Sequence, residues 1–410
     1  MGTAVTNRPG RAWIRPDSLT FTVLLGMLAS LPTFGIDMIL PTLSATAIAL
    51  RVSSSAIGQA MSIYLLSFGV ALLINGPLSD RFGRKPVALG GCALLAAASI
   101  GCGTAHSLPA LLVWRALQGA GASGPGMASF TLIRDLFEGE AARAKIAYVI
   151  SIINVVPMIA PTVGATLLAL AGWRSIYLVP MVGAVFLLLA VTRIAESAPV
   201  DAASKFRPST VLRDYFRVLA QPACLGNILC NAGGAGAVFA YISGSALVLI
   251  NVLGLSPGHY GLVFGASSVS VMVGTHVNRR LGAWGVPPSR LIAAGLAITI
   301  VLAAFLLITA LFGWTTTAVV IVVMVGVAIS FGLISPNAIH AAMQPLPQIA
   351  GAVSGASGFM QMAAAASSSS LVAALFDGRS AMSMGGVMLA FSLVAAGSSL
   401  WIARPAERLD

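Results

Sequence analysis

The chain has 410 residues, of which 58% are apolar and only 9% are charged. Soluble domains are usually about 45–50% apolar and about 25% charged, so 23 Lys and Arg with 12 Asp and Glu are too few to solvate a soluble protein of this length. This composition excludes soluble enzymes, disordered proteins and nucleic-acid-binding proteins, in spite of the net charge of +11. Apolar runs of about 20 residues recur from end to end, so the sequence predicts a polytopic membrane protein.

The apolar runs predict helices rather than strands. Strands of a membrane barrel alternate apolar and polar residues over about 10 residues, whereas residues 291–312 and 317–332 are almost continuously apolar. A helix satisfies its own backbone hydrogen bonds, which lipid cannot do. We therefore expect an all-α integral membrane protein with about twelve transmembrane helices. The expected spans are 19–42, 56–75, 87–105, 109–131, 146–170, 176–194, 222–250, 259–277, 289–312, 316–338, 351–375 and 382–403.

The longest polar interruption, residues 195–221, divides the spans six and six. We therefore expect an N-terminal six-helix bundle at 1–194, a cytoplasmic linker at 195–221, and a C-terminal six-helix bundle with a short tail at 222–410. The halves resemble repeats, because 76–83 and 274–282 place Gly, a short polar residue and Arg at the same spacing in corresponding positions. Such parallel repeats are typical of transporters that bind their substrate near the membrane midplane.

Basic residues gather in nearly every second loop, which predicts the orientation. The loops between them hold only Arg51, Arg174 and Arg379, and the loop between spans ten and eleven departs from the pattern by offering only His340. Because basic loops face the cytoplasm, both termini and the linker are expected there. The basic loops and ends contain Arg8, Arg11, Arg15, Arg81, Arg84, Lys85, Arg134, Arg143, Lys145, Arg279, Arg280, Arg290, Arg404 and Arg408.

Metal-ligating residue types are scattered. The four cysteines all lie within apolar spans, and the four histidines lie on different segments. We therefore expect neither a disulfide framework nor a metal site.

Two charged residues lie deep within expected spans: Asp37 in span one and Arg115 in span four. A charge in hydrocarbon is costly, so such residues usually face a cavity or each other. Asp37 could instead be an interfacial carboxylate at the end of a shortened span, and Arg115 could be a structural anchor to backbone carbonyls. Together they predict a proton site with a counter-charge, because burial favours the neutral carboxyl and a nearby arginine favours the charged one.

The segment 76–85 reads G-P-L-S-D-R-F-G-R-K. Its glycines permit tight turns, its aspartate can accept hydrogen bonds from a helix amino terminus, and its basic residues suit an anionic leaflet. The alternative is a plain positive-inside loop. Throughout its length the segment resembles the signature between spans two and three of the major facilitator superfamily. The residues that we expect to control conformation here are Gly76, Asp80, Arg81, Gly83, Arg84 and Lys85.

Two further motifs are similar to those of the same superfamily. Leu111-x-x-x-Arg115-x-x-Gln118-Gly119-x-Gly121 resembles its arginine motif, which is linked there to proton transfer. Pro157-x-x-Ala160-Pro161-x-x-Gly164 resembles its antiporter motif, with Ala160 where glycine is usual. Two prolines in one span bend the backbone, so the alternative for the second motif is a simple helix kink.

Asp37-Met38-Ile39-Leu40-Pro41 and Ser335-Pro336-Asn337-Ala338 resemble the bicyclomycin- and chloramphenicol-resistance branch of drug:proton antiporters. The resemblance covers nearly all of the chain. Relatives with a second acidic residue two helical turns before the aspartate would place it at Ala29, which cannot ionise. This departure argues against broad recognition of multiply charged cations.

The resemblance implies a bacterial inner-membrane protein, not an enzyme, that exports small lipophilic, phenicol-like drugs by alternating access. It implies protons, the drug and the lipid bilayer as partners, no cofactor beyond the proton gradient, no nucleic acid, and a monomer. The alternatives are a proton-coupled nutrient importer and a membrane-embedded enzyme, although no cluster of acids, histidines or nucleophiles is visible. Polar candidates for the substrate cavity, which lipid-facing packing could also explain, are Tyr64, Asn154, Asn231, Tyr241, Asn337 and Gln361.

Overall fold

The computed structural model describes residues 14–197 and 208–403, and within these ranges it contains helices and no strand. The helices are α1 (Leu19–Asp37), η1 (Leu40–Thr42), α2 (Leu43–Leu50), α3 (Ser54–Phe82), α4 (Arg84–Gly103), α5 (Leu108–Leu136), α6 (Gly139–Ala171), η2 (Trp173–Tyr177), α7 (Leu178–Thr192), α8 (Pro208–Ala220), α9 (Pro222–Ala246), η3 (Leu247–Val252), α10 (Pro257–Ala283), α11 (Pro288–Leu311), α12 (Thr317–Met343), η4 (Pro347–Ile349), α13 (Ala350–Ala374), α14 (Met382–Ser398) and η5 (Ser399–Ala403).

Eleven helical segments of the described chain are long and apolar enough to cross a membrane. The twelfth expected span is α5, which is rich in small residues and contains Arg115 and Gln118. Its polar residues do not face lipid, because α5 packs against α1, α3 and α4. The predicted all-α membrane fold is confirmed.

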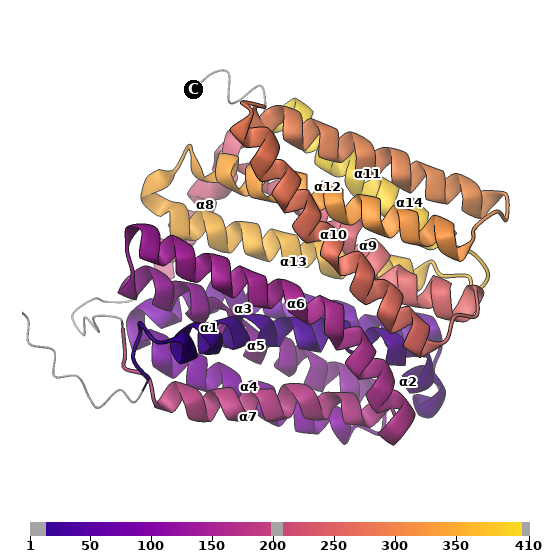
Figure 1. Ribbon diagram of the computed structural model, residues 1–410, viewed down its shortest axis with the longest axis horizontal. Helices are drawn as coiled ribbons and strands as arrows, with labels where there is room; N and C mark the ends of the chain where they lie inside the picture. Colours follow the sequence, from indigo (N-terminus) through magenta and orange to yellow (C-terminus); the bar gives the residue numbers. More distant parts are fainter. Residues whose placement is uncertain (1–13, 198–207, 404–410) are drawn as a thin grey trace, which may run out of the picture.

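The transmembrane helices form two groups (Figure 1). We call α1–α7 the first half and α9–α14 the second half. The halves contact each other along two seams, one between α3 and α13 and the other between α6 and α10. Helix α8 packs against α13 and α9. The domain boundaries at 194 and 222 stay a prediction, since part of the linker, like the basic residues Arg8, Arg11, Arg404 and Arg408, lies outside the described residues.

The α6–α10 seam is built on the two prolines of α6. Pro161 has no N–H, which leaves the carbonyl of Pro157 without its helical donor. The hydroxyl of Ser268 on α10 donates to this carbonyl at 3.4 Å. On another side of α6, a Cβ on Gly164 would lie 2.5 Å from the carbonyl oxygen of Met38. The antiporter-like motif therefore holds α6 against both α10 and the segment that follows Asp37.

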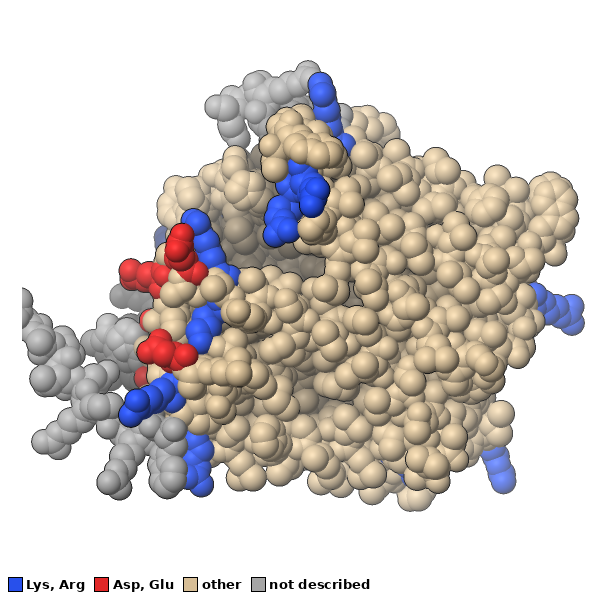
Figure 2. All heavy atoms as spheres, in the orientation of Figure 1, with Lys and Arg blue, Asp and Glu red and all other residues tan. Residues whose placement is uncertain are grey.

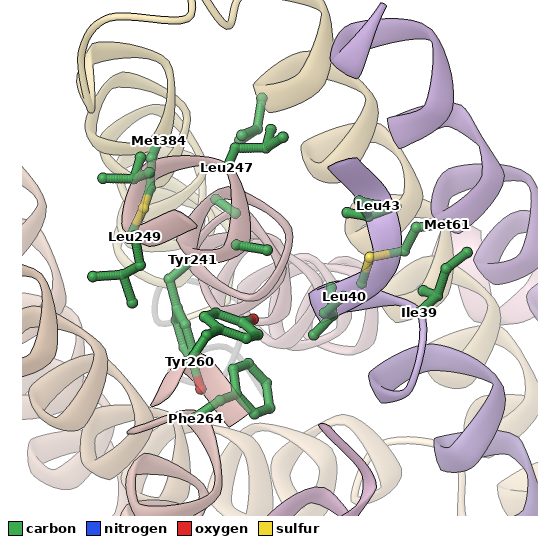
Figure 3. Packing of buried hydrophobic residues seen from close by; sticks show 14 of the residues in the cluster. Ile39, Leu40, Leu43, Met61, Tyr241, Leu247, Leu249, Tyr260, Phe264 and Met384 are labelled. Atoms are coloured by element: carbon green, nitrogen blue, oxygen red, sulfur yellow. The ribbon is translucent and has the colours of Figure 1, made fainter. Parts of the chain in front are cut away.

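The end of the molecule where α2 meets α3, called here the far end, is closed. Ser44 donates a hydrogen bond to Asn251 at 2.6 Å, and Ser370 donates one to Gln59 at 3.0 Å, so each bond joins the two halves. Beneath them apolar side chains of both halves form one buried cluster, called here the seal (Figure 3). Its labelled members are Ile39, Leu40, Leu43 and Met61 from the first half, and Tyr241, Leu247, Leu249, Tyr260, Phe264 and Met384 from the second.

The opposite end, where α3 meets α4, is called here the motif end, and it is open. Helices α6 and α10 touch near Gly261, where a Cβ would lie 2.9 Å from Thr162, and separate toward the motif end (Figure 1). A hollow lies there between the charged residues of the two halves (Figure 2). The structure therefore shows the access state that is closed at the far end and open at the motif end.

The prediction of a loop at 76–85 is wrong. These residues are helical on both sides of a single turn residue. Helix α3 continues through Pro77 to Phe82, and Gly83, at φ +100°, makes the turn into α4. Pro77 frees the carbonyl of Leu73, and the hydroxyl of Tyr215 on α8 donates to it at 3.4 Å. A neighbouring helix thus supplies a donor for the carbonyl that the proline has freed.

The positive-inside pattern predicts that the motif end is cytoplasmic, and two exposed histidines provide a matched test. His106 lies at the far end and His340 at the motif end. We expect His106→Cys to react with an impermeant thiol reagent from outside intact cells, and His340→Cys to react only after permeabilisation. The wild type is the control, because its four cysteines are buried. Labelling of both variants from the same side would contradict the topology.

The contact of Gly164 with Met38 predicts that Gly164→Ala loosens the seal. The added Cβ meets backbone that cannot rotate away, and such overpacking costs typically 1–3 kcal/mol. We expect a thiol at Ser44→Cys to react faster in this variant than in the wild-type background. Gly76→Ala is the matched control, because a Cβ at this other motif glycine meets open space. Equal reaction rates in the Gly164→Ala and Gly76→Ala backgrounds would show that the contact does not hold the seal.

Candidate functional site

Asp37 is the last residue of α1, directly before the segment that enters the seal, and its side chain is only 4% exposed. Among the described residues, neither of the two ion pairs includes it, and none of the hydrogen bonds reaches its carboxylate. By contrast, the surface carboxylate of Asp377 accepts hydrogen bonds from two backbone N–H groups and the Ser380 hydroxyl. A charged Asp37 in this state has lost its water without gaining a partner.

Three tyrosine hydroxyls lie within electrostatic range of Asp37. They belong to Tyr64 on α3, Tyr241 on α9 and Tyr260 on α10, so two of the three come from the second half. The Tyr260 hydroxyl lies 3.2 Å from that of Ser245, and its ring packs against Phe264 at 5.8 Å. Figure 3 shows these rings opposite Leu40, three residues after the aspartate. Asp37 therefore lies at the junction of the two halves, where their relative motion changes its surroundings.

Arg115 is the centre of a buried network in the first half. Its side chain is 1% exposed, its Nε donates to the carbonyl of Ala60 at 3.0 Å, and one terminal nitrogen donates to Gln118 at 2.6 Å. Gln118 in turn donates to Ser99 at 2.9 Å. The network joins α3, α4 and α5, and the second terminal nitrogen of Arg115 has no hydrogen-bond partner in the described part of the chain.

The charge pair expected between Asp37 and Arg115 is not formed in this state. Tyr64 connects the two instead, because its ring lies 4.3 Å from the Arg115 guanidinium and its hydroxyl donates to the carbonyl of Pro32 in α1 at 2.9 Å. Tyr64 is fully buried by these contacts. The glycines of the arginine motif let α5 pack closely against α3 and α4. Gly119 contacts the backbone of Tyr64 on α3, and a Cβ on Gly121 would lie 2.6 Å from the backbone nitrogen of Leu95 on α4.

At the motif end, Arg84 and Lys85 join four helices of the first half. Arg84 donates to Asp135 of α5 at 2.9 Å and to Asp80 at 2.5 Å. Lys85 donates to the carbonyls of Thr192 and Ile194 at 2.9 and 2.8 Å, at the end of α7. Asp80 is 67% exposed, and its ion pair with Arg84 lies within the first half.

Glu196 occupies the position that we expected Asp80 to take at the amino terminus of α4. Its two carboxylate oxygens accept hydrogen bonds from the backbone N–H groups of Arg84 and Lys85, at 2.8 and 3.0 Å. Gly83 permits this approach, since a Cβ there would lie 2.5 Å from the Glu196 carboxylate. Of the other motif residues, Arg81 lies over the Phe82 ring at 5.1 Å. A Cβ added to Gly76 of α3 would meet no other atom within 4 Å.

The amide side chains among the cavity candidates of the second half form two separate groups. Asn337 donates to Asn278 at 2.6 Å, and Asn278 occupies the place of Asp80 in the repeat, so an amide pair links α10 and α12. Asn231, fully buried on α9, donates to Ser357 at 3.5 Å and to Gln361 at 3.4 Å on α13, while its side-chain oxygen has no hydrogen-bond partner among residues 14–197 and 208–403. The remaining candidate, Asn154, is half-buried on α6.

Curated bacterial proteins resemble this chain along most of its length. An uncharacterized MFS-type transporter of Bacillus subtilis, YdgK, is 28% identical over 92% of this chain and 94% of its own. A bicyclomycin resistance protein homolog of Haemophilus influenzae is 27% identical over 88% and 90%. A chloramphenicol resistance protein of Pseudomonas aeruginosa is 32% identical over 66% and 64%. These relatives confirm the predicted resemblance to this resistance branch.

Solved transporter structures share the fold. A bacterial homolog of the human lysosomal transporter Spinster superposes with a TM-score of 0.73, at 15% identity, over 96% of this chain and 98% of its own. A D-xylose–proton symporter superposes with a TM-score of 0.68, at 16% identity, over 92% and 97%. The family model of the Major Facilitator Superfamily matches residues 23–369. The chain therefore belongs to the Major Facilitator Superfamily of transporters.

Proposed function

We propose that this multi-pass transporter exports a small lipophilic drug in exchange for protons, and that Asp37 is the group that binds the proton. The supporting observation is the position of Asp37, which is buried between the halves, directly beneath the seal, and has no counter-charge among the described residues. Arg115 tunes this site through Tyr64. The drug-resistance proteins among the relatives support the drug as substrate.

The position of Asp37 supplies a mechanism for the exchange. When the carboxyl is protonated, the seal can close over it at little cost, and the motif end is open. When it is charged, the seal excludes the water that the charge requires, so closure at the far end becomes unfavourable. Proton binding thus favours the state open at the motif end, and proton loss, linked to drug binding, favours the state open at the far end. Rocking of one half against the other converts the two.

The unpartnered oxygen of Asn231 supports a neutral drug with a hydroxyl or amide N–H group. A buried acceptor without a donor is unfavourable, typically by about 1–3 kcal/mol, and a drug donor can remove this cost. Gln361, 3.4 Å from the amide nitrogen of Asn231, supplies both a donor and an acceptor beside it. Phenicol-like antibiotics have hydroxyl and amide donors of this kind.

We also propose that the motif end faces the cytoplasm of a bacterium, so that the drug enters the hollow from the cytoplasm. Asp80 then belongs to the switch between states. In the state described here it pairs with Arg84 and remains exposed. In the state closed at the motif end, α13 of the second half approaches this corner, and Asp80 gains a contact between the halves.

Asp37→Asn tests the proton site, because it keeps the size of the side chain and fixes it in a neutral form. We expect purified Asp37→Asn to bind drug but to release no protons on drug addition, and its gradient-driven drug transport to fall to the level of protein-free liposomes. Asp377→Asn is the matched control, since it makes the same change at the surface, and should match the wild type. Unchanged proton-driven transport by Asp37→Asn would refute the assignment, and drug movement in the same direction as the protons would indicate an importer.

If Asp37 carries one proton for each drug, the charge of the drug determines whether the membrane voltage drives its export. One proton entering for one neutral drug leaving moves net positive charge inward, which an inside-negative voltage favours by about 2.3 kcal/mol per 100 mV. A monovalent cationic drug would exchange without net charge movement, and a dication would move charge against the voltage. With Ala29 in place of a second acid, we expect neutral drugs to be favoured. The voltage dependence of drug flux can be measured in proteoliposomes whose membrane potential is clamped with potassium and valinomycin. Efflux of a neutral drug that does not change with voltage would contradict the prediction.

A further inference from the structure

Helix α8 has an exposed apolar stripe that the transport cycle does not explain. With 13 residues it is too short to cross a membrane. Leu212, Phe216 and Leu219 are 57%, 62% and 43% exposed. Their spacing of four and three residues places them on one face of the helix.

The other faces of α8 differ in a fixed order around the helix. Val218 and Tyr215 face the protein, where Val218 is fully buried and Tyr215 lies 3.0 Å from the position of a Cβ on Gly355 of α13. Arg213 and Arg217, one turn apart and both exposed, lie on the opposite flank of the apolar stripe. Going around the helix, a protein-facing side is followed by an apolar side and then by a basic side.

The location of α8 places this apolar side at the rim of the molecule. Its Tyr215 reaches the carbonyl of Leu73 on α3 and packs against α13, so α8 lies across the outer α3–α13 seam at the motif end. A short helix with one apolar and one basic face, at the end of a bundle of transmembrane helices, has the pattern of a helix that lies in the membrane interface.

We propose that α8 is an interfacial helix that binds anionic phospholipid. Leu212, Phe216 and Leu219 enter the boundary between head groups and acyl chains, while Arg213 and Arg217 bind lipid phosphates. The charge complementarity of two exposed arginines beside an apolar stripe favours anionic lipid over an apolar protein surface, which would leave the arginines unpaired. Because the protein-facing side of α8 contacts both α3 and α13, the lipid that α8 binds also supports the seam between the halves.

A spin label at Phe216→Cys in the full-length protein tests the proposal. The unsubstituted protein is the labelling blank, since its four cysteines are buried. In nanodiscs of phosphatidylglycerol we expect the label to be more accessible to oxygen, which partitions into lipid, than to a water-soluble nickel chelate. Native mass spectrometry of the unlabelled protein then measures how much phosphatidylglycerol it retains relative to phosphatidylcholine.

Arg213→Gln with Arg217→Gln should weaken the preference for phosphatidylglycerol by roughly thirty-fold, which corresponds to the attraction of about two arginines to an anionic surface. The matched control is Arg279→Gln with Arg280→Gln, which removes the same charge from exposed residues of α10 at the same end. It should leave the environment of the label at Phe216 unchanged. A label that the nickel chelate reaches better than oxygen would overturn the proposal. So would equal lipid preference in the two double variants, or a dimer in which the label is shielded from both reagents.

Discussion

The buried carboxyl of Asp37, without a counter-charge, is the constraint on which the two access states depend. Moving an ion into a low-dielectric interior costs several kcal/mol unless partners replace the lost water. In this state Asp37 has no such partner among the described residues, and the segment that follows it enters the seal through Met38, Ile39, Leu40 and Leu43, in one buried cluster with Tyr241 and Tyr260. The charge of one side chain and the closure of one end of the transporter therefore influence each other.

Carbonyls that prolines have freed take part in the helix contacts around this site. In a membrane every backbone polar group needs a partner within the protein. Pro161 frees a carbonyl that Ser268 of the second half satisfies, and Pro77 frees one that Tyr215 of the linker satisfies. Single hydrogen bonds of this kind contribute only about 0.5–1.5 kcal/mol each, so the bond from Ser268 can support the contact between the halves without locking it.

Much of the fold and part of the site could be predicted from the sequence. The apolar runs between polar breaks predict the spans, because lipid demands continuous apolar helices, and they include α5 although it contains Arg115 and Gln118. Asp37 and Arg115 were identified by their depth alone. Their separation by Tyr64 could not be predicted, since it depends on how α1, α3 and α5 pack.

Other features depend on contacts between distant residues. Glu196 lies at the edge of a polar linker, where nothing in its local sequence distinguishes it from a solvated charge, yet it binds the start of α4 over a separation of more than 110 residues. The repeat of 76–83 at 274–282 was the one available signal for the pair formed by Asn278 and Asn337. The carbonyl that Pro77 frees accepts a hydrogen bond from Tyr215, which belongs to another segment.

The central claim is that the proton on Asp37 controls closure of the far end. The most direct test is the distance between spin labels at Ser44→Cys and Asn251→Cys, measured across the far end over a range of pH. The account predicts a short distance at low pH and a growing population of long distances as the pH rises. It also predicts that Asp37→Asn keeps the short distance at every pH. A distance distribution independent of pH in the protein with Asp37, or one that changes in the same way with Asp37→Asn, would contradict the account.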